Sequence, residues 1–115
     1  MDIEKYTNRV QTLIQNAQNY ALTCGHQQVL PEHLLHSMLW EKKSGVTELL
    51  IKARIDTTIL QNQLQIKLSK VPKVEGGQIF LSTELAKVFA QSQILSQKNN
   101  DFFISEDIIL LALVT

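Results

Sequence analysis

Two histidines, His33 and His36, lie three residues apart in the segment PEHLLHSM, and Glu32 directly precedes the first of them. Imidazole and carboxylate groups on one face of a helix can hold a transition metal, so a small metal-dependent enzyme is one hypothesis. A zinc site needs three or four ligands, and the order H-E-x-x-H of zinc peptidases is absent. His26 is the remaining histidine. We therefore expect no metal site, with one of the paired histidines partly buried and the other solvated.

Three acids near the end of the chain, Asp101, Glu106 and Asp107, form a second candidate group. Paired carboxylates can act as general acid and base in hydrolysis. Acids are also favoured in the first turn of a helix, where they face the positive end of the dipole, and Ser105 is placed to cap such a helix. We interpret the acids as a helix start, and Cys24 lacks the partner residues of a nucleophile.

The phosphate-binding pattern G-x-x-x-x-G-K-[ST] is absent. The sequence therefore predicts no catalytic residue, no cofactor of its own and no ATP hydrolysis by this chain alone. Eleven basic and eleven acidic residues balance, which disfavours a nucleic-acid partner. A single cysteine fits a reducing cytosol. We expect no secretory signal, because the polar start MDIEKYTNRV has no apolar core, and no apolar run approaches the length that spans a bilayer.

The elements that position these groups repeat within the chain at an offset of 75 residues. Thr7 corresponds to Ser82, and the helix starts Pro31 and Glu106 correspond to each other. The apolar positions Val10, Leu13, Ile14, Ala17 and Tyr20 fall on Leu85, Val88, Phe89, Ser92 and Leu95. Further along, Val29, Leu34, Leu35, Met38 and Leu39 fall on Ile104, Ile109, Leu110, Leu113 and Val114. A fixed shift that keeps helical apolar positions over two segments indicates an internal repeat.

We therefore predict an all-α fold made of one domain over residues 1–115, a pseudo-two-fold bundle of duplicated helical units. The first unit, residues 1–70, has helices over 3–23, 31–41, 46–54 and 57–68, the last capped by Asp56. Thr7 caps the first helix or lies in its first turn, and Val46, Leu49, Leu50 and Ala53 face inward on the third. Ile59 and Ile66 lie beside the apolar stripe of the fourth helix.

Residues 71–81 contain proline and a Gly–Gly pair and are predicted to be a linker. The partial second unit, residues 82–115, has helices over 83–97 and from 106 onward, and it stops after two helices. We therefore expect the chain to be a piece of a longer protein. We also expect an exposed apolar patch over the last two helices, or self-association through it.

Three aromatic residues have open interpretations. Phe102 and Phe103 are neighbours and point in different directions, so one is expected in the core and the other at the surface. Trp40 is either an interaction anchor or packs under the polar connector Lys42–Gly45.

Several segments resemble the N-terminal domain of Clp-type ATPase chaperones. They are Ala17–Leu22, the turn Gly25–Gln28, the helix start Pro31–Leu35, the linker Val71–Gly77 and Phe103–Ser105. The resemblance covers nearly the whole chain, and the linker makes it most similar to the ClpB disaggregase branch.

This resemblance implies a mobile, non-catalytic appendage of a bacterial cytoplasmic AAA+ protein. Such a domain engages unfolded or aggregated polypeptide in an apolar groove, while ATP and magnesium act in separate ATPase modules. It also implies a homohexameric parent that cooperates with a DnaK-type chaperone. Carried over by position, the rim of the groove is Thr7, Asp101 and Asp107, and its apolar side chains come from Phe89, Leu95, Ile104 and Ile108. The family usually has Glu where this chain has Asp107, and the missing third and fourth helices of the second unit can change the groove.

Two alternatives to this client-binding module stay open. Within the same class, the chain is the adaptor-docking N-domain of a ClpA- or ClpC-like unfoldase. A small metal-dependent enzyme that uses His33 and His36 is the alternative from a different class.

Overall fold

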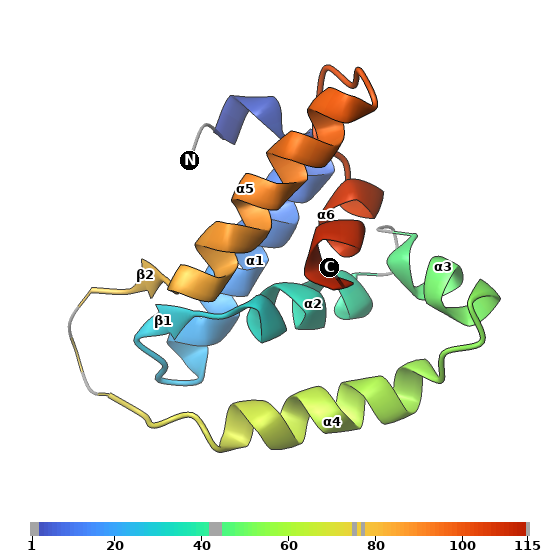
Figure 1. The fold of residues 1–115 in the computed structure, drawn as a ribbon. Coiled ribbons are helices and arrows are strands. Elements are labelled where there is room, and N and C mark those ends of the chain that lie inside the picture. Colours follow the sequence, from blue (N-terminus) through green and yellow to red (C-terminus); the bar gives the residue numbers. More distant parts are fainter. Residues whose placement is uncertain (1–2, 42–44, 75, 77, 115) are drawn as a thin grey trace.

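The computed structural model describes residues 3–41, 45–74, 76 and 78–114. Its elements are a 3₁₀ turn η1 (Ile3–Lys5), helices α1 (Asn8–Thr23), α2 (Pro31–Trp40), α3 (Val46–Lys52), α4 (Thr57–Ser69), α5 (Thr83–Lys98) and α6 (Glu106–Val114), and two short strands, β1 (Gln28–Val29) and β2 (Phe80–Leu81). The predicted all-α class is confirmed (Figure 1). No helix in the described part of the chain has the length and apolar character to cross a membrane.

The two helix pairs begin at equivalent positions. Helices α1 and α5 are both 16 residues long, and both start and end 75 residues apart; α2 and α6 start at the same offset. The hydroxyl of Thr7 accepts a hydrogen bond from the Val10 N–H, and the hydroxyl of Ser82 accepts one from the Leu85 N–H. Each cap satisfies one of the amides that a helix start leaves unpaired.

The ends of α1 and α5 also match. Gly25 and Asn100, which are 75 residues apart, both have a left-handed backbone, with φ of 75° and 58°. The next residue in each copy, His26 or Asp101, donates its backbone N–H five residues back, to the carbonyl of Ala21 or Ser96. Glycine and asparagine are the residues that adopt this conformation at least cost, so a local signal ends both helices in the same way.

The two halves exchange short parallel strand contacts. Val29, before α2, pairs with Leu81, before α5, and Ile104, before α6, pairs with Tyr6, before α1. Equivalent bonds hold both pairs, because Ser82 N–H donates to the Val29 carbonyl and Thr7 N–H donates to the Ile104 carbonyl, each at 3.0 Å. Each half therefore binds the other through the segment that precedes its second helix.

This exchange corrects one predicted boundary. The first helix was expected from residue 3, but the chain forms η1, turns at Tyr6 and starts α1 at Asn8. Tyr6 uses its backbone in the bridge to Ile104, and its ring packs edge-on against Phe89 with centroids 5.7 Å apart. A residue in a strand pair cannot also continue a helix, so the long-range contact fixes where α1 begins. The region predicted as linker, 71–81, likewise ends in β2.

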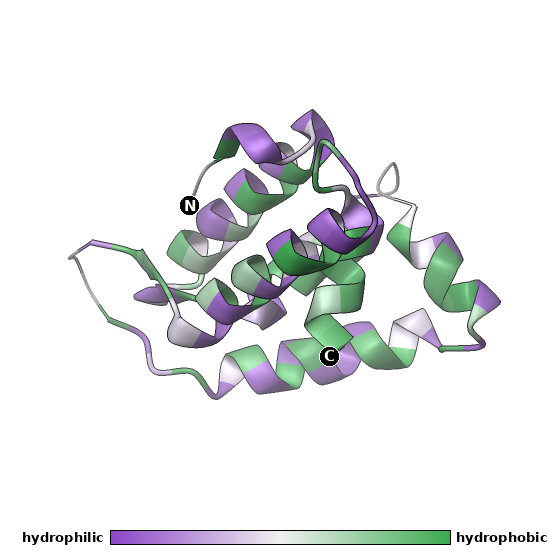
Figure 2. Cartoon of the chain, turned by 45° about the horizontal axis from the view of Figure 1, so that its top comes forward, coloured by the Kyte–Doolittle hydropathy of each residue, from purple (hydrophilic) through white to green (hydrophobic). Residues whose placement is uncertain are grey.

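Helices α3 and α4 cover α2 from one side, and α4 runs along one edge of the molecule (Figures 1 and 2). Asp56 caps α4 as predicted, accepting from the amides of Thr58 and Ile59. Only Val46 and Leu50 of α3 are buried, so the prediction that Leu49 and Ala53 face inward is wrong. A helix of seven residues presents one narrow face, which these two side chains fill. Ile59 and Ile66 of α4 are exposed.

The apolar core lies between α1, α2, α5 and α6. Surface apolar residues also lie on the α5–α6 side, where Ile94, Leu111 and Val114 are exposed. The predicted connector residues 42–44 and Thr115 lie outside the described residues.

Candidate functional site

The polar residues predicted to form a rim come from three segments that meet at one end of the molecule. Thr7 begins α1, Asp101 follows α5 and Asp107 lies in the first turn of α6. The bridge between Tyr6 and Ile104 joins these segments, because Thr7 N–H donates to Ile104 and Ile104 N–H donates to the Lys5 carbonyl at 2.7 Å. We call this region, residues 3–7 and 101–107, the rim end.

The acids of the rim end have local partners. Asp101 is exposed, and its backbone carbonyl accepts from the Ser96 hydroxyl at 3.5 Å. The Asp107 carboxylate accepts a hydrogen bond from the Ser105 hydroxyl, and Glu106 forms an ion pair with Arg9 at 3.7 Å. Glu106 and Asp107 therefore lie in the first turn of a helix, as the interpretation expects, whereas Asp101 follows the end of α5 and is not at a helix start.

The apolar residues predicted for the groove face inward. Phe89, Ile104 and Ile108 are each no more than 5% exposed and belong to the core, while Leu95 is half-buried against it. Their role as binding residues stays a prediction, and in this structure only the edge of Leu95 is open to solvent.

Two neighbouring aromatic side chains instead form the apolar surface of the rim end. Phe102 is 94% exposed and Phe103 is 59% exposed, so the prediction that one of them lies in the core is wrong. Ile104 supplies the core contact of this loop, because its backbone is fixed in the bridge to Tyr6. Sequence periodicity gave no signal for this, since the loop belongs to no helix.

The histidines form a buried hydrogen-bonded pair rather than an open site. His33 is fully buried and its Nε2 lies 2.8 Å from Nδ1 of His26. The Leu30 N–H donates to His33 Nδ1 at 2.8 Å, so this nitrogen carries no proton and Nε2 is the donor to His26. Burial, followed by the neighbouring His26 and His36, lowers the pKa of His33 to about 4. Both ring nitrogens of His33 are therefore occupied in the neutral form.

No group of three or more histidine, cysteine, aspartate or glutamate side chains comes together among the described residues in a way that suits a metal. His36 neighbours His33 on α2, but its ring is stacked between Tyr20 and Trp40. The described residues therefore contain no set of side chains that could serve as the metal ligands of the proposed metal-dependent enzyme.

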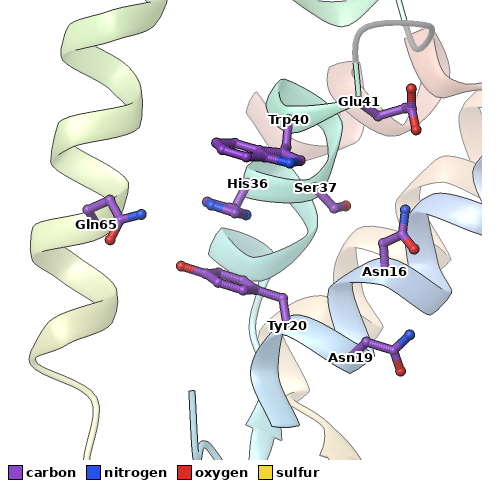
Figure 3. Close-up of a pocket in the computed structure, with 8 residues that line it drawn as sticks. All are labelled: Asn16, Asn19, Tyr20, His36, Ser37, Trp40, Glu41 and Gln65. Carbon is purple, nitrogen blue, oxygen red and sulfur yellow. The ribbon is translucent and has the colours of Figure 1, made fainter. Parts of the chain in front are cut away.

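A column of three aromatic rings lies on α1 and α2. His36 of α2 stacks on Tyr20 of α1, with centroids 3.9 Å apart and planes within 8°, and Trp40 continues the column at 6.0 Å and 9°. The column borders a hollow of about 550 Å³ that Asn16, Asn19 and Gln65 also line (Figure 3). Trp40 is 75% exposed, and residues 42–44 of the connector under which it was predicted to pack lie outside the described residues. The four-residue spacing of His36 and Trp40 was the available sequence signal, because it places both on one helical face.

Comparison with known proteins agrees with this fold. The chain matches the Clp repeat (R) N-terminal domain over residues 5–115. Over 98% of its length it is 41% identical to the chaperone protein ClpB of Brucella suis and 40% identical to ClpB of Rhizobium meliloti. It spans only 13% of the length of these relatives.

Solved structures show the same architecture. The N-terminal domain of Hsp104 from Candida albicans superposes with a TM-score of 0.85 at 24% identity, covering 95% of this chain and 73% of that one. The N-terminal domain of the ClpV1 ATPase from E. coli superposes with a TM-score of 0.89 at 19% identity, covering 96% and 68%. The family's domain is a non-catalytic part of the ClpB chaperone. The chain belongs to the Clp N-terminal domain family and is homologous to the N-terminal domain of ClpB chaperones.

Proposed function

We propose that this domain engages unfolded or aggregated polypeptides for a ClpB-type disaggregase, and that the rim end is where they bind. The observation that carries the proposal is the family match over residues 5–115 together with about 40% identity to ClpB chaperones. The chain spans 13% of the length of those relatives, so the remaining properties are proposed for the whole protein of which it forms the N-terminal domain. We propose that this whole protein is a homohexameric ATPase that uses ATP and magnesium, works with a DnaK-type chaperone and acts in the bacterial cytoplasm.

The chemistry of the rim end supports this role. Two exposed phenylalanines, Phe102 and Phe103, offer apolar contact area, and Asp101 and Asp107 beside them offer acceptors for peptide N–H groups. A surface with few oriented polar groups binds apolar segments without strict choice of sequence. Weak binding of this kind suits a module that passes its client onward.

A peptide complex exists for a protein of the same fold. The N-domain of ClpV, which shares 20% identity and a TM-score of 0.79, has been solved in complex with a VipB peptide. We propose that this chain also binds peptide, with Phe102 and Phe103 making the first contact. Phe89, Ile104 and Ile108 are buried in the core, so their contact with a peptide requires the segment 101–105 to shift.

Titration with reduced, carboxymethylated lactalbumin, an unfolded polypeptide, tests the proposal by NMR. We expect the amide signals of Thr7, Leu95, Asp101 and Asp107 to move, and those of Phe89, Ile104 and Ile108 to follow if the loop opens. Saturable binding to a folded adaptor, with no response to the unfolded chain, would favour the adaptor-docking role instead.

A pair of charge-neutralising variants sharpens the test. The double variant Asp101→Asn, Asp107→Asn should weaken binding by about threefold to tenfold, because each exposed charged contact contributes up to about 1 kcal/mol. Glu48→Gln is the matched control, since Glu48 is an exposed acid on α3, away from the rim end. Equal affinities for the double variant and the control would contradict a role for the rim acids.

A further inference from the structure

The aromatic column Tyr20–His36–Trp40 has one ring whose outer side is open. Trp40 ends the column, and at 75% exposure most of its indole is in contact with solvent. Tryptophan is usually among the more buried side chains, and exposed, oriented tryptophans are enriched at binding hot spots. The rings beneath it hold its orientation, so a partner that stacks on it meets a preorganised surface.

The column is electrically neutral near pH 7. Burial lowers the pKa of His36, so its imidazole is uncharged there. Burial, followed by Cys24, raises the pKa of Tyr20, so the phenol keeps its proton. Among the described residues that line the hollow, Glu41 is the charged one, and Figure 3 shows its carboxylate directed away from the rings. A charged ligand therefore finds no fixed counter-charge at the rings.

Three of the described residues at the hollow have side-chain polar groups without a hydrogen-bond partner in the protein. Within the described residues, the Trp40 indole N–H, the His36 ring nitrogens and the Asn16 amide make no hydrogen bond. Asn19, by contrast, accepts one from Gln15 at 3.2 Å. Figure 3 shows Asn16 and Asn19 on one side of the column and Gln65 of α4 on the other. Amide and N–H groups that present both donors and acceptors match the alternating groups of a peptide backbone.

The geometry points to a second polypeptide-binding site at this hollow, separate from the rim end. Its occupant is an extended segment with an aromatic side chain, which stacks on Trp40 while its backbone hydrogen-bonds to Asn16 and His36. A volume of about 550 Å³ lies within the range of small-ligand pockets, which suits one aromatic side chain with its adjoining peptide groups.

Other ligand chemistries fit less well. A phosphate or carboxylate ligand needs a cation, and the described lining residues supply none. An aliphatic side chain gains burial but not the preference of aromatic rings for offset stacking. An arginine side chain can also stack on tryptophan, but the neutral column adds no ionic attraction to hold it.

The inference rests on the proposed function, because it assumes that the domain binds unfolded polypeptide. Trp40 is the single tryptophan of the chain, so its indole N–H signal in NMR reports this site alone. The probes are three short Gly/Ser peptides that differ only in a central Phe, Leu or Arg. We expect the Phe peptide to move the Trp40 indole signal and to bind at least about threefold more tightly than the other two.

The decisive variant is Trp40→Leu, which should weaken binding of the Phe peptide by about tenfold, while Trp40→Phe keeps a stacking ring and recovers part of it. Because Trp40 is exposed, neither change should alter the fold, and an unchanged amide spectrum checks this. Phe80→Leu is the matched control, since it also removes an exposed aromatic ring, but on β2 and in neither proposed site. Binding at the hollow should be unaffected by it.

The outcomes separate the two proposals. Shifts at Thr7, Asp101 and Asp107 that survive Trp40→Leu, with a silent indole signal, overturn the second site and leave the rim end standing. Shifts at the indole of the parent protein without shifts at Thr7, Asp101 and Asp107, together with weaker binding of the Phe peptide by Trp40→Leu, support the second site and contradict the rim end. Equal affinity for the Phe and Leu peptides, or tighter, salt-sensitive binding of the Arg peptide, overturns the aromatic assignment.

Discussion

The first helix pair, α1 and α2, and the second, α5 and α6, share their starts, caps and turns but carry their buried polar groups in different places. In the first pair these are His33 and Ser37, both on α2; in the second they are Ser92 and Ser96, both on α5. Ser37 bonds to the carbonyls of Leu13 and Leu34, and Ser92 bonds to the Phe89 carbonyl. A duplicated backbone therefore tolerates different interiors, provided that each buried polar group finds a partner.

The pairs also differ in what covers them. Helix α2 packs against α3 and α4 as well as α1, whereas α6 packs mainly on α5 and also meets α3. His33 lies at the position of Ile108 in the second pair, so the more thoroughly covered helix is the one that carries the buried histidine. The following experiments test whether the two halves are energetically equivalent despite these differences.

The largest effects should come from equivalent core positions. Leu34 and Ile109 correspond in the repeat and are both about 1% exposed. Leu34→Ala and Ile109→Ala should each lower the free energy of unfolding by about 2–5 kcal/mol, because each leaves a cavity in the shared core. Urea unfolding followed by circular dichroism measures both.

The exposed Leu22 provides a control for the same chemical change, and Leu22→Ala should stay within about 0.5 kcal/mol of the parent. A large loss at only one of the two core positions would show that the halves do not share one core.

Acidification should lower the stability contributed by the first helix pair, α1 and α2, more than that contributed by the second, α5 and α6. The folded-state pKa of His33 is about 4, against an ordinary value of 6.5, so between these values the unfolded chain binds a proton that the folded chain does not. The contribution of His33 is intact above pH 6.5 and is lost as the pH falls toward 4, by up to about 3 kcal/mol.

The variant His33→Ile installs the kind of side chain found at Ile108 and removes this titration. The free energy of unfolding should therefore fall less steeply from pH 7 to pH 4 in the variant than in the parent. If the free energy of unfolding depends on pH in the same way in the parent and in His33→Ile, His33 is not held neutral in the folded protein. His36, whose pKa is also lowered by burial, remains in both proteins. His26 loses its hydrogen-bond partner in the variant, so the difference between the two pH profiles reports the His26–His33 pair.

The two N-caps should contribute similar amounts. Thr7→Ala and Ser82→Ala each leave a helix-start amide without its acceptor and should cost about 1 kcal/mol. Ser82 is buried and its bond is shorter, 3.0 Å against 3.3 Å, so its loss should be the larger of the two. Thr7→Ser and Ser82→Thr keep the hydroxyl and serve as controls in thermal unfolding; losses equal to those of the alanine variants would argue against capping.

The smallest differences should appear at the turns after α1 and α5. Both Gly25 and Asn100 are left-handed, so Asn100→Gly should change the free energy of unfolding by less than about 0.5 kcal/mol. Gly25→Ala should cost about 1 kcal/mol, because a Cβ there has ordinary contacts with Lys73 and only the backbone is strained. Chemical unfolding of the two variants side by side measures the difference; a stable Gly25→Ala variant would mean that this turn relaxes.

Signals within a few residues predicted the helices well. Ser82 and Asp56 cap the helices that the sequence assigned to them, and the starts of α5 and α6 agree with the repeat offset. Predictions that depended on distant contacts did less well. Leu49 was expected inside and lies outside, and Phe102 and Phe103 both lie at the surface, because the space available to each is set by elements far away in the chain.

The candidate site shows the same division. The resemblance named Thr7, Asp101 and Asp107, and the fold brings their segments to one end, but periodicity gave no indication that Phe102 and Phe103 are both exposed there. The spacing of His36 and Trp40 places both on one helical face, but the sequence did not predict the complete ring column. Tyr20 joins the other two rings only because α1 packs on α2.

The sequence by itself determined the helical class, the caps of α4 and α5, the turns that end α1 and α5, and the duplication, because hydrogen bonding and side-chain periodicity within one or two turns decide them. The tertiary structure alone decided that Val29 pairs with Leu81 and that Tyr6 pairs with Ile104. It also decided that the exposed ring of Trp40 ends a column of stacked rings. These features depend on how two halves meet in space, and no single segment carries the information for that meeting.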